Sequence, residues 1–167
     1  MDRIDREILV HLQHDGRLAT AELARRIRLS PTPTLRRVKA LEEAGVISGY
    51  HAHVDLDAID RGFHVLVWVN LIASTTDYIE AFEDAVVDIE DVMEAHRLFG
   101  EPDYLLKVAV RDATAYEHLY TTTLSALPGI RRALSQITMK TVKHGRTVPL
   151  GSTTPVTRGA RRGQALR

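Results

Sequence analysis

The apolar positions of the first 45 residues recur every three or four residues, which is the spacing of amphipathic helices. Capping residues divide this pattern into three predicted helices, which begin at Asp2, Thr20 and Ser30. Gly16 and Gly45 are placed to end the first and the third. The apolar stripes of the three helices consist of Ile4, Ile8, Leu9 and Leu12, then Leu23, Ala24 and Ile27, then Leu35, Val38 and Leu41. A short connection before a third, capped helix is typical of a helix-turn-helix.

The third predicted helix opens with two prolines, in the stretch "SPTPTLRRVK". With Ser30 as the N-cap, Pro31 and Pro33 occupy the first and third helical positions. Backbone N–H groups in the first turn have no partner within the helix, so neither proline removes a hydrogen bond. The prolines therefore favour a helix that starts at Ser30.

The outward face of this third helix combines small side chains with cations. Arg36 lies at its centre, and Arg37 and Lys39 flank it. An arginine can bond base edges in the major groove while flanking cations neutralise phosphates, so the sequence predicts a recognition helix. The predicted DNA-contacting residues are Ser30, Thr32, Pro33, Thr34, Arg36, Arg37 and Lys39. A salt-bridged surface is the alternative, which is disfavoured because the outward-facing residues before Glu42 include no acid.

Residues 46–54 alternate short apolar and polar side chains around Gly49, which predicts a small β-wing. The DNA-binding domain is therefore predicted to span residues 1–54, and residues 55–63 are predicted to be a linker. His51 and His53 have the spacing of a metal-binding pair. No third ligand is evident, so we expect a wing or surface pair and no metal site.

The second half of the chain alternates patterns of strands and helices in the order βαββαβ. Strand-like runs include "HVLVWVNLIAS", "DYLLKVAVR" and "IRRALSQITMKTVKH", and helical spacing is clearest at Ile79, Phe82, Val86 and Ile89. This order predicts a ferredoxin-like sandwich over residues 64–148. Glycine, proline, threonine, serine and arginine dominate after Gly145, and residues 149–167 are predicted to be a mobile basic tail. The predicted fold class is α+β, a winged helix-turn-helix followed by a ferredoxin-like domain.

Composition adds limits to this picture. The 167 residues suit one large domain or two small ones. The chain has no cysteine, which excludes a disulfide framework and a cysteine-ligated zinc site. The longest apolar run, Val65 to Val69, is far too short to cross a membrane, and no charged-then-apolar signal segment opens the chain. We expect a cytoplasmic protein with no membrane partner and no cofactor.

Charge is unevenly distributed although the formal net charge is zero. Seven of the ten basic residues in positions 1–62 fall between Arg17 and Lys39, where Glu22 is the single acid. Such a concentration indicates a polyanionic partner, although a solvated helical surface has the same composition. Residues 63–117 carry 3 basic and 12 acidic side chains, whereas residues 118–167 carry 9 basic and no acidic ones.

Residues 1–150 resemble the Lrp/AsnC family, the feast/famine transcriptional regulators. The stretches that carry the resemblance are "LSPTPTLRRVKALEEAGVI", "FGEPDYLLKV" and "LPGIRRALSQITMKTVK". The resemblance implies a DNA-binding regulator that responds to a small effector, often an amino acid. It also implies homodimers, formed through the sandwich domain, that assemble into tetramers or octamers with the effector bound where dimers meet.

The resemblance also assigns effector-site residues by position. One wall of the site is expected to consist of Gly100, Glu101, Pro102, Asp103 and Tyr104. A neighbouring subunit is expected to contribute Ser135, Gln136 and Thr138. Asp103 could accept a hydrogen bond from a ligand ammonium group, as a zwitterion requires. The alternative is that Gly100–Tyr104 forms only a hairpin turn.

Two other functions remain open at this point. Sirohaem decarboxylases are similar to this family in fold and length, so the fold alone does not exclude an enzyme. His96 and Arg97 could then serve a haem-like substrate, although a hydrogen-bonded strand histidine is the simpler interpretation. The cationic helix and the Gly100–Tyr104 loop are both intact, which favours the regulator. A stand-alone amino-acid sensor would bind the ligand but not DNA.

Overall fold

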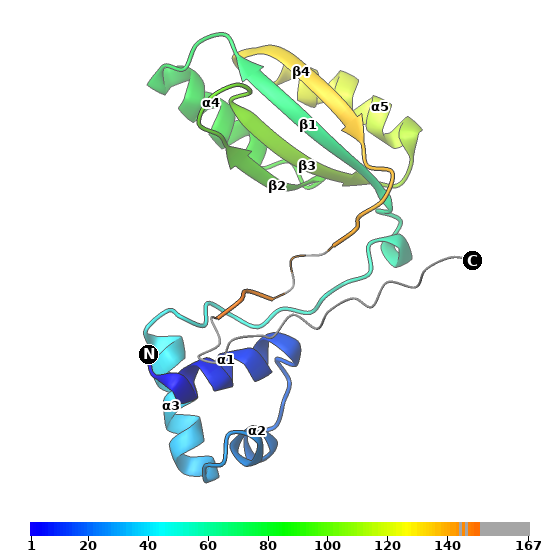
Figure 1. The fold of residues 1–167 in the computed structure, drawn as a ribbon. Coiled ribbons are helices and arrows are strands. Elements are labelled where there is room, and N and C mark those ends of the chain that lie inside the picture. The colour runs from blue at the N-terminus through cyan, green and yellow to red at the C-terminus, as the bar shows by residue number, and fades with distance from the viewer. Residues whose placement is uncertain (144, 146, 151–167) are drawn as a thin grey trace, which may run out of the picture. The chain divides into compact units, whose positions relative to one another are not determined.

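The computed structural model describes residues 1–143, 145 and 147–150, and the polypeptide forms two compact units (Figure 1). The first contains residues 1–52 together with residues 143, 145 and 147–150, and the second contains residues 53–142. The sequence predicted that residues up to 148 belong to the second domain. The structure instead groups the described residues after Val142 with the first unit. Most of the predicted tail, residues 151–167, lies outside the described residues.

The first unit contains three helices, α1 (Arg3–His14), α2 (Thr20–Arg26) and α3 (Pro31–Glu43). Asp2 caps α1 through a capping box with Asp5, and Ser30 and Pro31 start α3 as the sequence predicts. The N-cap of α2 is Ala19 and not Thr20, because Ala19 has the extended backbone and its carbonyl accepts the Leu23 N–H. The buried core consists of Ile8, Leu9, Leu23, Ile27 and Leu41.

The buried face of α3 differs from the predicted stripe by one position. Thr34 is fully buried, whereas Leu35 is 44% exposed. The Thr34 hydroxyl donates to the Ser30 carbonyl oxygen at 2.9 Å, so a polar side chain is buried here without losing a hydrogen bond. Thr34, Val38 and Leu41 therefore form the inner stripe.

The predicted β-wing strands are not formed in the structure. Residues 44–62 contain one short helical turn, η1 (Asp57–Ile59), and no strand. A two-stranded hairpin is marginally stable without a third strand or a packed face, and no described strand pairs with this segment. Instead, the Tyr50 hydroxyl donates to Glu42 Oε1 at 2.9 Å and joins the segment to α3. Burial and this bond raise the pKa of Tyr50 to about 12.

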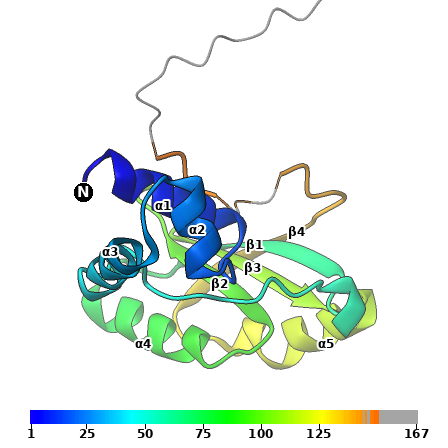
Figure 2. The ribbon, with the colours of Figure 1, turned by 90° about the horizontal axis from the view of Figure 1, so that it is seen from below.

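The second unit is the predicted βαββαβ sandwich. Its elements are β1 (Phe63–Leu71), α4 (Thr76–Val87), β2 (Val92–Arg97), β3 (Tyr104–Val110), α5 (Ala113–Thr122), the short turn η2 (Leu124–Ala126) and β4 (Ile130–Ile137). The sheet is antiparallel with strand order β2-β3-β1-β4. Figures 1 and 2 show α4 and α5 on the same side of this sheet.

The core of the second unit lies between the sheet and these two helices. Alternate residues of β1 are buried, from Val65 to Leu71, and pack against Phe82 of α4, which is fully buried. Side chains point alternately to the two faces of a strand, so His64, Leu66 and Trp68 lie on the face without helices. That face remains only partly covered within the unit.

Candidate DNA-binding and effector sites

The outward surface of α3 presents two cations without ion-pair partners. Arg36 and Lys39 are exposed, and neither forms an ion pair within the part of the chain that the structure describes. Ser30 and Thr32 are exposed at the start of the helix, and Pro33 is half-buried. The helix therefore presents a basic surface, with Arg36 and Lys39 free to meet a polyanion.

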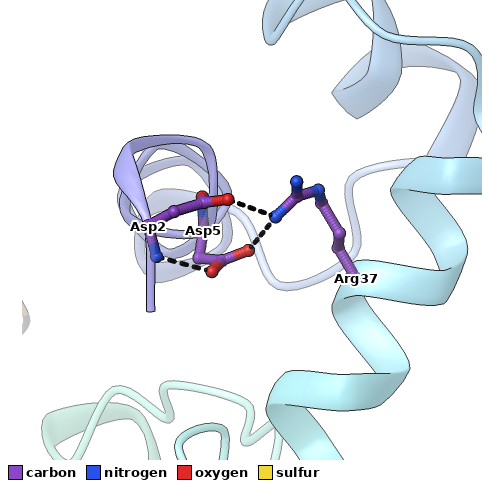
Figure 3. Close-up of polar contacts among 3 residues, drawn as sticks. All are labelled: Asp2, Asp5 and Arg37. Carbon is purple, nitrogen blue, oxygen red and sulfur yellow. Dashed lines mark hydrogen bonds and ion pairs between the residues drawn. The ribbon is translucent and has the colours of Figure 1, made fainter.

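Arg37 differs from its neighbours because it binds two carboxylates of α1. Its Nη1 donates to Asp2 Oδ2 at 2.7 Å and to Asp5 Oδ1 at 2.8 Å (Figure 3). The hydrogen bonds that Arg37 donates to Asp5 and Asp2 raise the pKa of Arg37 above its usual range. The sequence suggested that the outward face has no acid to pair with. That interpretation is wrong for Arg37, because the acids come from another helix.

The arginines of α2 also have a carboxylate partner. Arg25 and Arg26 both donate to Glu22, with distances of 2.7–2.8 Å. Hydrogen bonds from Arg25 and then Arg26 lower the pKa of Glu22 to about 2. Two of the seven basic residues between Arg17 and Lys39 are therefore paired with the one acid of that stretch.

The predicted effector loop borders a hollow of about 460 Å³ in the second unit. A hydrogen bond of 2.7 Å from the Leu98 N–H to the Asp103 carbonyl oxygen closes the loop. Gly100 has φ 115, a backbone conformation that glycine adopts without strain. The residues that line the hollow are Leu71, Ile72, Ala73, Ser74, Ile79, Arg97, Leu98, Phe99, Gly100, Glu101, Asp103, Tyr104 and Arg131.

Asp103 connects the loop to the end of β1. Its carboxylate accepts the Leu71 N–H at 2.8 Å and the Ser74 hydroxyl at 3.3 Å. The Asp103 carboxylate is therefore bonded to residues outside its own turn. The Glu101 carboxylate forms an exposed ion pair of 3.2 Å with Arg131 of β4. Both acids line the hollow, together with Arg97 and Arg131.

Tyr104 lines the hollow, but its side chain belongs to the core. It is 2% exposed, its ring centroid lies 4.5 Å from that of Phe82, and its hydroxyl donates to Glu83 at 2.7 Å. Burial, and then the bond to Glu83, raise the pKa of the Tyr104 hydroxyl. The Tyr104 hydroxyl is therefore already bonded within the unit, and the place of Tyr104 in the wall of the effector site stays a prediction.

The three predicted residues of β4 and the segment after it do not line this hollow. Ser135 bonds Tyr116 of α5, Gln136 accepts the Trp68 indole N–H at 2.8 Å, and the Thr138 N–H donates to the His64 carbonyl at 2.9 Å. Within one subunit these residues are separate from the Gly100–Tyr104 loop. Their predicted contribution to a neighbouring subunit's site remains a prediction.

Nine lining residues were not predicted from the sequence, among them Ser74, Arg97, Phe99 and Arg131. Arg97 and Phe99 directly precede Gly100, so their closeness to the loop was available from their position. Ser74 and Arg131 reach the hollow only because β1 and β4 are neighbours in the sheet. No local pattern marks them.

No group of three or more histidine, aspartate or glutamate side chains among the described residues is placed to hold a metal ion. None of the helices in this part of the chain is both long and apolar enough to cross a membrane.

Two family models together match almost the whole described chain. The winged helix-turn-helix DNA-binding model matches residues 1–48, and the Lrp/AsnC ligand binding domain matches residues 64–148. The chain belongs to the Lrp/AsnC family. It is a DNA-binding transcriptional regulator with a ligand-binding domain, which confirms the resemblance found in the sequence.

Curated relatives cover nearly the same length. The chain is 41% identical over 150 residues to the Bkd operon transcriptional regulator of Pseudomonas aeruginosa, which covers 90% of the chain and 98% of the relative. It is 43% identical over 143 residues to the leucine-responsive regulatory protein of Escherichia coli K12, which covers 86% and 87%. These matches favour the regulator over the decarboxylase alternative.

Solved structures of the family have the same fold. A transcriptional regulator of Neisseria meningitidis in complex with L-Met has a TM-score of 0.86 and 35% identity, and the match covers 90% of this chain and 97% of that one. AsnC of Escherichia coli has a TM-score of 0.81 and 26% identity over 89% and 97% of the two chains. The winged helix-turn-helix plus ferredoxin-like architecture predicted from the sequence is thereby confirmed.

Proposed function

We propose that this regulator recognises specific DNA sequences by placing α3 in the major groove. The observation that carries this proposal is that Arg36 and Lys39 are exposed on α3 without ion-pair partners among the described residues. Arg36 bonds a base edge, most favourably guanine, and Lys39 contacts phosphate. Ser30, Thr32 and Pro33 approach the DNA at the start of the helix.

Two predicted contacts are revised by their surroundings. The Thr34 side chain is buried and its hydroxyl is used, so it makes no base contact. Arg37 bridges α3 to the start of α1 and acts as a positioning residue for the recognition helix. Arg36 is therefore the main determinant of base preference on this helix.

A selection experiment tests this assignment. Duplexes of random sequence are enriched with the parent protein and with Arg36→Ala, and the preferred sites are compared. The variant should lose roughly 1–3 kcal/mol of binding free energy and relax its preference at one base position in each half-site. The exposed Glu43→Ala, at the far end of α3, serves as the matched control. An unchanged site preference in Arg36→Ala would remove α3 from base recognition.

The hollow beside the Gly100–Tyr104 loop suits an amino acid with an apolar side chain. Asp103 and Glu101 offer acceptors for an ammonium group, and Arg97 and Arg131 offer donors for a carboxylate. Ile72 and Phe99 supply apolar surface, and Phe99 is fully exposed within the subunit. The names of two relatives, which specify leucine and L-Met, support the same ligand class.

Asp103→Asn tests the ammonium contact while keeping the fold. The asparagine oxygen can still accept the Leu71 N–H, so assembly and DNA binding should be retained. Removing the charge should weaken binding of L-leucine or L-methionine on the order of a hundredfold in calorimetry. Ser74→Ala removes the weaker partner of Asp103 and should have a smaller effect. Equal affinities in Asp103→Asn and the parent would exclude Asp103 from the ligand contacts.

We further propose homodimers formed through the sheet face that lacks helices. That face carries the partly exposed Leu66 and Trp68 and the 45% exposed Leu134, which form apolar surface for a second copy. Dimers then assemble into tetramers or octamers, with Ser135, Gln136 and Thr138 of a neighbouring subunit completing the effector site. Light scattering of Leu134→Glu against the parent tests the dimer: an unchanged mass would exclude this face.

The regulator acts on chromosomal DNA, which supports the predicted cytoplasmic location. The decarboxylase alternative has little support in the site. His96 bonds Glu94 at 2.9 Å, so it is a hydrogen-bonded strand histidine. A visible-range spectrum of the purified protein without a tetrapyrrole band is expected.

A further inference from the structure

The first unit contains a groove of about 440 Å³ that the fold of the helix-turn-helix alone leaves open. Its walls come from α1, through Leu9, Leu12 and Gln13, and from the segment after α3, through Val46 and Tyr50. This segment was predicted to form a β-wing and has no strand partner. Its attachment to α1 must therefore depend on side-chain packing.

The chain's own C-terminal segment forms another wall of this groove, through Val148 and Leu150. The Val148 N–H donates to Gln13 Oε1, and Leu150 packs against the same core as Ile47 and Leu12. Val148 itself is 70% exposed, while Leu150 is half-buried. Val148 thus contributes a backbone hydrogen bond, and Leu150, two residues later, contributes a packed side chain. These contacts are made more than 130 residues away from α1 in sequence.

We infer that the surface made by α1 and the segment after α3 is the docking surface for residues 147–150, and that the C-terminal segment is a structural part of the DNA-binding unit. Leu150 fills apolar space between α1 and the segment after α3, and takes the place of the strand that would otherwise hold a wing. The helix-turn-helix is therefore joined to the chain of residues 53–142 twice, once directly after Ala52 and once through the docked residues 147–150.

Hydrogen exchange of the full-length protein, read by mass spectrometry, tests the packing. Leu150→Asp places a charge in the groove, and Val148→Asp places the same charge on an exposed side chain two residues away. Exchange should rise several-fold in peptides covering residues 8–14 and 45–50 of Leu150→Asp and remain at the parent rate in Val148→Asp. Exchange in β1 and β3 should be unchanged in both. Parent-like exchange at residues 8–14 and 45–50 in Leu150→Asp would overturn the inference.

Cross-linking tests whether residues 147–150 lie beside α1, and this test does not depend on a change in stability. The chain contains no cysteine, so Gln13→Cys with Val148→Cys introduces a single reactive pair. A short bismaleimide should join them within one chain and give a monomer band of altered mobility in denaturing gels. Glu7→Cys with Val148→Cys is the matched control, because Glu7 lines a different hollow. Cross-linking that is equal in the two pairs, or that joins only separate chains, would contradict docking of this segment in its own groove. Neither experiment requires DNA or effector, so failure here is separable from failure of the proposed function.

Discussion

The cations of α3 should contribute differently to the salt dependence of DNA binding. Lys39 has no ion-pair partner in the described structure, whereas Arg37 donates to two carboxylates within 2.8 Å. A cation that neutralises a phosphate releases a counterion, but one already neutralised by aspartates releases little. Lys39→Gln should therefore flatten the salt dependence, and loss of Arg37 should not.

The expected magnitude follows from the counterion relation. Each phosphate contact contributes about 0.9 to the slope of log K against log salt concentration. Between about 50 and 200 mM salt, one lost contact then reduces the fall in affinity by a factor of about 3.5. For Arg37 the comparison needs a charge-matched variant, since removing it alone would leave Asp2 and Asp5 to repel DNA. Arg37→Gln combined with Asp5→Asn removes one charge of each sign and should keep the parent slope.

Fluorescence anisotropy with one labelled duplex, titrated at four or more salt concentrations, measures these slopes directly. Circular dichroism of each variant shows whether α1 and α3 remain folded. Asp5→Asn alone is a further control, because its amide oxygen can still accept the Asp2 N–H of the capping box. If the slope of the Arg37 and Asp5 double variant falls by as much as that of Lys39→Gln, then Arg37 contacts phosphate and its assignment as a positioning residue is wrong.

Four further predictions concern stability, pH and the C-terminus. Tyr104→Phe should lower the free energy of unfolding by about 1 kcal/mol, because the bond to Glu83 is lost. Effector affinity measured by calorimetry should be unchanged. A large loss of affinity would show that the Tyr104 hydroxyl contacts the ligand. Phe82→Ala should cost about 3–5 kcal/mol in urea unfolding, because the side chain is fully buried. The pKa of Glu22 in the folded protein is about 2, below its ordinary 4.5. The stability that Glu22 contributes is therefore fully present above pH 4.5 and is lost as the pH falls toward 2. In acid unfolding, Glu22→Gln should lose less stability over this pH range than the parent. Truncation after Leu150 should preserve the oligomer and the site preference but weaken non-specific binding at low salt, and a changed mass in light scattering would contradict this.

The sequence by itself determined the elements of this protein and their order. Helical spacing and the prolines of α3 are local properties, because they depend on the conformations of residues within a few positions of one another. The βαββαβ order is also local information, and the short connections that it allows restrict the topology to few arrangements. The effector loop around Gly100 was predicted from the family resemblance, which rests on a stretch of consecutive residues, and it stays a prediction.

Tertiary structure decided which of these residues are available for function. The partners of Arg37 lie 32 and 35 residues away, and the partner of Val148 lies 135 residues away, so no window of sequence could reveal them. The one-position shift that buries Thr34 and exposes Leu35 depends on how α3 packs against the other two helices. Tyr104 looked like a ligand contact in the loop, but the sheet turns its ring toward Phe82. Charge and spacing identify candidate residues, while packing against distant segments determines which side chains are already bound and which are free.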